Sequence, residues 1–235
     1  SSSSSKKYLD DIVDWFERLV KKLENRIDLN AARAENNYKL TNKETYINRQ
    51  LKDNQDLQKY YKQATSMYTK KSEQFAKQLG LSKDLKNKVQ NGKVDLGKLS
   101  DDDKKKVEAY QKWFDKINDC KKAIEELKQK ERDLYQQKLD NITDRYDAVI
   151  SVYSSYNDAL SSLNSLREEK GASQAPGSAY AKTLQDMISA GKTQSTKILE
   201  EYNKYQAEYQ KYKKKYGEDD TQTKAAKAKA NELVQ

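Results

Sequence analysis

The chain contains few side chains that could carry out catalysis. None of its 235 residues is a histidine, so a Ser-His-Asp triad, a Cys-His dyad or a histidine-bound metal cannot form from this chain alone. Asp101, Asp102 and Asp103 form an acidic run, but a calcium loop alternates its oxygen ligands and contains a glycine and a terminal glutamate. We interpret the run as the acidic first turn of a helix. We therefore expect no catalytic residue, no metal site and no cofactor.

The single cysteine, Cys120, lies between Ile117 and Ile124 at helical spacing. Apolar surroundings raise the pKa of a thiol and make it a poor nucleophile. One cysteine can form neither an internal disulfide nor a cysteine-rich zinc site. We expect Cys120 to be a buried structural thiol.

Tyrosines form a stripe near the C-terminus, with steps of three and four residues between them: Tyr202, Tyr205, Tyr209, Tyr212 and Tyr216. Lysines interleave with these rings, as in a platform that stacks single-stranded nucleic acid. The alternative is a helix seam whose rings pack on a partner and keep their hydroxyls at its edge. Residues 200–235 carry 8 Lys against 7 Asp and Glu, which is too balanced for strong phosphate binding. We favour the packing seam, keep the stripe as a candidate interaction surface, and expect no specific nucleic acid.

Composition predicts long helices with narrow apolar seams. Apolar and charged residues each make up 35% of the chain, and it has 7 Gly and 1 Pro. Sandwich, barrel and βαβ folds need more turn residues than this, whereas high charge with few breakers is typical of long helices. There is no run of about 18 apolar residues, so we expect no membrane segment in this chain.

Two composition breaks, at residues 80–100 and 171–178, divide the helical sequence. We predict an all-α fold of elongated antiparallel helical hairpins, or a coiled coil, around one long helix at 101–170. The predicted parts are a disordered linker or cloning remnant at 1–7, an amphipathic helix at 8–35, a helical hairpin at 45–170 with a capping connection at 80–100, a second fold-back helix at 171–216 and a short helix at 217–235. Ser82 and Ser100 are predicted N-caps, and Asn91-Gly92 a turn. Val94, Leu96 and Leu99 are expected to pack over the hairpin tip.

The long helix carries an apolar seam with heptad spacing. The seam slips by one residue at Leu134/Tyr135, and Glu131 occupies one of its positions. Gly191 interrupts the fold-back helix, at a cost of about 1 kcal/mol relative to alanine. The residues expected to pack in the seam are Trp113, Ile117, Cys120, Ile124, Leu127, Leu139, Ile142, Tyr146, Val149, Tyr153 and Leu160.

Read in order, four stretches resemble the tail tape measure proteins of long-tailed phages and prophages of Gram-positive bacteria. They are VDWFERLVKKLENRIDLNAARAENN, YINRQLKDNQDLQKYYKQA, GLSKDLKNKVQNGKVDL and VEAYQKWFDKINDCKKAIEELKQKERDLYQQKLDNITDRYD. The most specific pieces are KVQNGKVDL, EAYQKWFDKINDC and KLDNI. The resemblance covers roughly residues 14–216.

This resemblance implies an extended helical protein inside the tail tube, whose length sets tail length. It also implies partners (tail tube and tail-tip proteins and tail assembly chaperones) and a location in the virion tail lumen, or in the host cytoplasm during assembly. Family members are usually longer, and the membrane-active stretch or wall-degrading domain of many is not visible here. The family offers no catalytic residue to transfer.

Three questions stay open at this point. A surface or secreted helical adhesin, or a secretion-system coiled-coil protein, is one alternative to the tape measure interpretation. Binding of single-stranded nucleic acid through the tyrosine and lysine helix is the other. Periodicity also does not decide whether the seams pair within one chain or between chains, so self-association remains open.

Overall fold

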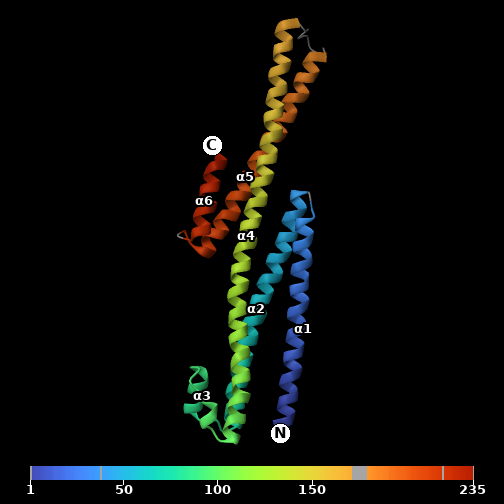
Figure 1. The fold of residues 1–235 in the computed structure, drawn as a ribbon. Coiled ribbons are helices and arrows are strands. Elements are labelled where there is room, and N and C mark those ends of the chain that lie inside the picture. The colour runs from blue at the N-terminus through green and yellow to red at the C-terminus, as the bar shows by residue number, and fades with distance from the viewer. Residues whose placement is uncertain (1, 38, 171–178, 219, 235) are drawn as a thin grey trace. The chain divides into compact units, whose positions relative to one another are not determined.

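The structure is a computed structural model that describes residues 2–37, 39–170, 179–218 and 220–234 (Figure 1). Over these residues the chain forms six α-helices and one 3-10 turn, with no strand, which confirms the all-α prediction. The elements are α1 (Ser2–Glu35), α2 (Leu40–Gln78), α3 (Lys83–Gln90), η1 (Leu96–Lys98), α4 (Asp101–Lys170), α5 (Ala179–Tyr216) and α6 (Thr221–Val234).

The chain divides into two compact units. The first unit consists of Ser1–Arg33 and Asn48–Leu134, and the second consists of Ala34–Ile47 and Tyr135–Gln235. Helix α4 contributes to both. The border between them falls at Leu134/Tyr135, the position where the apolar seam slips by one residue.

Helix boundaries follow the breaks in the sequence closely. Helix α4 spans the predicted residues 101–170, and α5 ends at Tyr216 before Gly217, whose φ is +87°. The predicted break at 171–178 lies outside the described residues. Two starts differ from the prediction. Helix α2 begins at Leu40 and not at Thr45, and residues 2–7, predicted to be a disordered linker, belong to α1. The reason is that the serines and lysines there include no glycine or proline that would stop the helix.

The connection between α2 and α4 in the first unit is ordered by its caps. Ser82 accepts a hydrogen bond from the Leu85 amide, and Ser100 accepts one from the Asp103 amide at 3.2 Å. Gly92 has a φ of +66°, which a turn at Asn91-Gly92 requires. These observations confirm the predicted caps and turn.

The tip of this hairpin has a small core of its own. Its buried members are Ala76, Leu81, Val89, Val107 and Tyr110, and Val94 and Leu99 pack against them as expected. Leu96 was expected to join them, and that expectation is wrong, since its side chain is 37% exposed. Leu96 opens the 3-10 turn η1, whose N-cap Asp95 accepts from the Gly97 amide at 3.1 Å. We infer that this tight turn directs the side chain outward.

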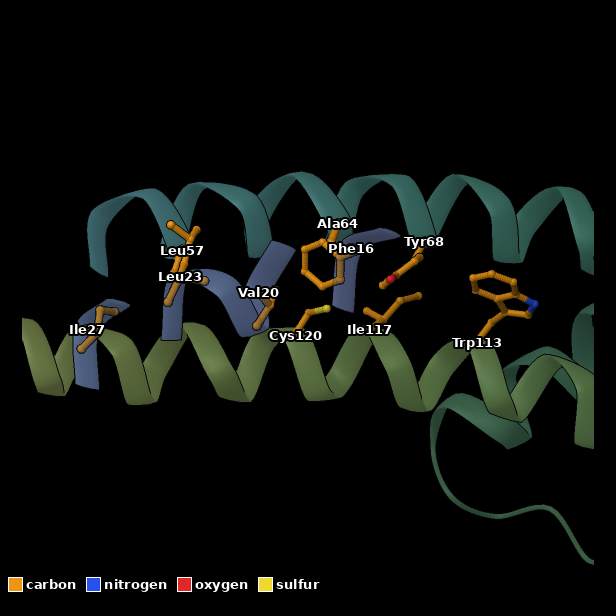
Figure 2. Packing of buried hydrophobic residues seen from close by; sticks show 10 residues of the cluster. All are labelled: Phe16, Val20, Leu23, Ile27, Leu57, Ala64, Tyr68, Trp113, Ile117 and Cys120. Atoms are coloured by element: carbon orange, nitrogen blue, oxygen red, sulfur yellow. The ribbon is translucent and has the colours of Figure 1, made fainter. Parts of the chain in front are cut away.

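The main core of the first unit lies among α1, α2 and α4. Figure 2 shows Leu57, Ala64 and Tyr68 of α2 opposite Cys120, Ile117 and Trp113 of α4, with side chains from α1 between them. Phe16 of α1 packs edge-on against Tyr61 and Tyr68 of α2, with ring centroids 5.4 and 6.2 Å apart. Such edge-to-face pairs stabilise a core beyond their buried area.

The core of the second unit is built on tyrosines and alanines. Leu139 and Ile142 of α4 pack with Tyr205 and Tyr209 of α5, and Ala226 and Ala230 of α6 complete the cluster. Alanines at these two positions leave room for the large rings of α5 beneath α6.

Candidate functional site: the helix seams

In the second unit, α4 and α5 pair antiparallel in a constant register. Four contacts define it: Tyr135 with Tyr212, Lys138 with Glu208, Arg145 with Glu201, and Tyr156 with Gly191. The two residue numbers in each pair add to 346 or 347. The helices therefore run alongside each other without a slip over these turns.

The tyrosine stripe of α5 lies inside this unit. Tyr205, Tyr209 and Tyr212 are 1%, 6% and 1% exposed, and Tyr202 and Tyr216 are partly buried. The Tyr205 hydroxyl donates to the Ala226 carbonyl at 3.0 Å, and burial raises the pKa of Tyr205. Bases cannot stack on rings that α4 and α6 cover. The stripe therefore packs as an internal seam, as the favoured interpretation predicts, and Tyr205, Tyr209 and Tyr212 are not exposed as an interaction surface.

Two ionic contacts accompany the tyrosines. Lys138 lies 2.9 Å from Glu208, and both side chains are nearly buried. The Arg145 guanidinium pairs with two carboxylates, Glu44 near the start of α2 and Glu201 on α5, the latter at 2.8 Å. Arg145 is only 8% exposed. It therefore ties the start of α2 to the α4–α5 pair within the second unit.

A neighbouring amide strengthens the same attachment. Asn141, one turn before Arg145 on α4, donates from its side chain to the Leu40 carbonyl at 2.8 Å. Leu40 is the first residue of α2. Together, Asn141 and Arg145 explain why α2 begins before Thr45, because they hold its first turn against α4.

In the first unit, a polar layer interrupts the apolar seam. Glu131 is 1% exposed and accepts hydrogen bonds from Gln58 at 2.8 Å and Gln55 at 3.3 Å. Gln58 also donates to Asn54, which in turn donates to the Leu127 carbonyl at 3.0 Å. Buried polar groups of this kind are satisfied only when the helices stand in one register, so the layer favours that register over its neighbours.

A further ionic contact joins α1 to α2 beside this layer. The Arg26 guanidinium binds both carboxylate oxygens of Asp53, with Nε 3.2 Å from Oδ2. This bond raises the pKa of Arg26. Two parallel hydrogen bonds of this type fix geometry as well as charge.

The predicted seam residues of α4 all face the packed side of the helix. Trp113, Ile117, Cys120, Ile124, Leu139 and Ile142 are buried, and Leu127, Tyr146, Val149, Tyr153 and Leu160 are partly buried. Cys120 lies in the main core, and its burial raises the pKa of the thiol. The residues that sequence reasoning missed are the polar partners of the seam, Gln55, Gln58, Asn141 and Arg145. The presence of Glu131 in the apolar seam was a signal for its partners Gln55 and Gln58, but not for Asn141 and Arg145.

The acidic run and the largest groove described in the first unit offer no arrangement of catalytic side chains. Asp101 and Asp102 are exposed in the first turn of α4, and Asp102 pairs with Lys106 at 3.1 Å. A groove of about 710 Å³ lies among α1, α2 and α4, with Val13, Phe75 and Trp113 in its lining and charges of both signs at its edges. Across the described residues, no cluster of three or more acidic or cysteine side chains is arranged to bind a metal ion.

A search of the described helices for a long apolar stretch that could span a membrane finds none.

Searches against protein family models, curated proteins and solved structures find no match to this chain.

Proposed function

We propose that this chain is a non-catalytic structural segment that acts as a helical ruler or scaffold in phage tail assembly. The resemblance to tail tape measure proteins suggests this role, together with tail tube and tail-tip proteins and tail assembly chaperones as partners. The proposed location is the tail lumen of the virion, and the host cytoplasm during assembly.

The observation that carries the proposal is the constant register between α4 and α5. Each helical residue adds about 1.5 Å along a helix axis, so residue number translates directly into length. Because the pairing repeats without a slip, equal numbers of residues can be removed from both helices and the remaining pairs still match. A ruler needs this property, whereas a catalytic site does not.

The register also defines a clean experiment. Residues 150–163 of α4 face residues 184–197 of α5, so deleting both stretches removes two heptads from each helix and leaves Val149 opposite Ile198. In a phage that carries this chain in its tail protein, we expect the double deletion to shorten the tail. Paired helices should shorten it by about 21 Å, and helices placed end to end in the tube by about 42 Å. Electron microscopy of many tails measures the difference.

The matched control is Tyr156→Ala in a chain from which no residues are deleted. It weakens the α4–α5 contact without removing residues, so tail length should stay at the wild-type value. Tails of unchanged length in the double deletion would contradict the ruler role, and so would tails shortened equally by the control.

A further inference from the structure

The outer face of α1 carries two large apolar side chains that the first unit does not cover. Trp15 is 62% exposed and Leu29 is 49% exposed, whereas the other tryptophan, Trp113, is buried. The core face of α1 is a different one, formed by residues such as Phe16 and Ile27. The exposed residues are therefore not part of the seam that holds α1 in the unit.

Three cations share this outer face. Trp15, Lys22 and Leu29 are spaced by seven residues, and Arg18 and Arg33 lie within one turn of them, so all five project to one side of the helix. Arg18, Lys22 and Arg33 are exposed, and among the described residues none of the three has a carboxylate partner. This differs from Arg26, which binds Asp53.

The acidic residues of α1, except Asp11, lie on another flank. At about 100° per residue, the others are roughly 100° or more away from Trp15 around the helix, whereas Asp11 lies one turn before Trp15 on the outer face, which therefore carries three cations and one carboxylate. One of the others, Glu17, lies 3.9 Å from Lys116 of α4, so this acidic flank is turned toward α4. The acidic residues on that flank are Asp10, Asp14, Glu17, Glu24, Asp28 and Glu35.

We propose that the outer face of α1 (Trp15, Arg18, Lys22, Leu29 and Arg33) docks an acidic amphipathic helix of a partner protein. Trp15 and Leu29 pack against apolar side chains of that helix, and its Asp and Glu residues pair with the three cations. The seven-residue repeat is the spacing at which one helix meets another along a seam. The proposal does not depend on the ruler role.

The narrow apolar strip on the outer face of α1, with cations beside it, favours a helix over an anionic membrane as the occupant. A helix that lies in a membrane surface buries a broad apolar face in the lipid. The broad apolar face of α1 is already buried, with Phe16, Val20, Leu23 and Ile27 in the core of the unit. What remains outside is a narrow line of two apolar residues flanked by cations.

The test uses the purified full chain and two synthetic peptides of about four heptads. Both peptides have leucine at the a and d positions, and one carries glutamate and the other lysine at the flanking positions. Binding is followed by the anisotropy of a dye on the peptide and by tryptophan emission. We expect the glutamate peptide to bind at least about tenfold more tightly than the lysine peptide, and the emission of Trp15 to shift to the blue.

Two neighbouring lysines provide matched variants. Lys22→Glu reverses a charge on the outer face, and Lys21→Glu makes the same change on the other flank of the same helix; both side chains are exposed. We expect Lys22→Glu to weaken binding about fivefold and Lys21→Glu less than about twofold. Trp15→Phe should abolish the blue shift, with the helical circular dichroism of each variant unchanged.

Several results would overturn the proposal. These are equal affinity for the two peptides, no binding of either, or equal losses in Lys21→Glu and Lys22→Glu. Binding of the chain to vesicles that contain phosphatidylserine, without binding of the glutamate peptide, would assign the face to membranes and also overturn it.

Discussion

Tyr156 of α4 lies so close to Gly191 of α5 that a Cβ atom at position 191 would come within 2.6 Å of the tyrosine Cε1. Gly191 is buried in the middle of a continuous helix. From the sequence alone, this glycine is only a weak point in α5. In the structure it gives the Tyr156 ring a place against the α5 backbone, and this contact offsets the loss of helix propensity.

Gly191→Ala is therefore expected to destabilise the wild-type chain by about 1 kcal/mol. The new methyl group forces the Tyr156 ring out of its place, and the strain exceeds the gain of about 1 kcal/mol in helix propensity. Urea unfolding followed by circular dichroism measures the change.

The same substitution should have the opposite sign in a Tyr156→Ala background. Without the ring, only the gain in propensity remains, so the chain should become more stable by up to about 1 kcal/mol. If Gly191→Ala has the same effect in both backgrounds, the two residues are not coupled and the interpretation is wrong.

The polar layer around Glu131 makes a prediction about register. Glu131→Ala should cost about 2 kcal/mol, because the Gln58 amide loses one of its two buried acceptors and keeps only Asn54. Glu126→Ala, at an exposed position of the same helix, should cost less than about 0.5 kcal/mol. Denaturation by urea compares the two variants.

Replacing the layer as a whole should have a different result from breaking it. The triple variant Asn54→Leu, Gln58→Leu and Glu131→Leu should be at least as stable as the wild type, since no polar group is left unpaired. We expect it to lose the single register, which disulfide trapping between cysteines placed on α2 and α4 would detect as several cross-linked pairs. One cross-linked pair in the triple variant would argue against a specificity role for the layer.

Much of the fold could be predicted from the sequence because helices dominate it and few residues interrupt them. The start of α4 and the end of α5 follow from Ser100 and Gly217, which are strong local signals. Heptad spacing also indicates which side of α4 is packed. Each of these signals lies within one helix and needs no knowledge of a partner.

The rest depends on which helices meet, and local patterns do not contain that information. Glu131 occupies a seam position in the sequence, but nothing there identifies Gln58, 73 residues away, as its partner until α2 and α4 pair. For the tyrosine stripe the sequence favours a packing seam but does not indicate that α6 covers it, because α6 contributes only alanines such as Ala226 and Ala230 to the core. Alanines carry too weak an apolar signal to reveal that they bury other residues.

Buried tyrosines predict a loss of stability at alkaline pH. Burial raises the pKa of Tyr68 to about 12, with Cys120 and Glu17 adding to the shift, and burial likewise raises the pKa of Tyr61 to about 12. An unfolded tyrosine ionises near pH 10. The stabilising effect is therefore fully present below about pH 10 and is lost as the pH rises toward 12.

Difference absorbance of tyrosinate and circular dichroism, recorded together in a pH titration, test this prediction. Helix should be lost between about pH 10 and 12, at the same pH as a cooperative rise in tyrosinate. Tyr68→Phe keeps a ring of nearly the same shape but cannot ionise, so its midpoint should move to higher pH. Gradual tyrosinate formation with intact helices would show that the rings of the first unit are accessible.

Arg145 is expected to be the most sensitive charged residue of the second unit. Arg145→Met removes the cation between Glu44 and Glu201 and leaves two poorly hydrated carboxylates close together, which should cost about 3 kcal/mol. In a chain of this size that corresponds to a fall of roughly 6–12 °C in Tm. Lys121→Met removes the same charge at an exposed position of α4 and should change Tm by less than about 2 °C.

Neutralising the two partners should then restore stability. With Glu44→Gln and Glu201→Gln added to Arg145→Met, no unpaired charge remains, and we expect most of the lost Tm to return. Hydrogen exchange should place the damage at the start of α2, because Arg145 and Asn141 hold that turn against α4. A loss in Arg145→Met no larger than in Lys121→Met, or one that the two glutamines do not repair, would mean that this ion pair does not hold the turn in place.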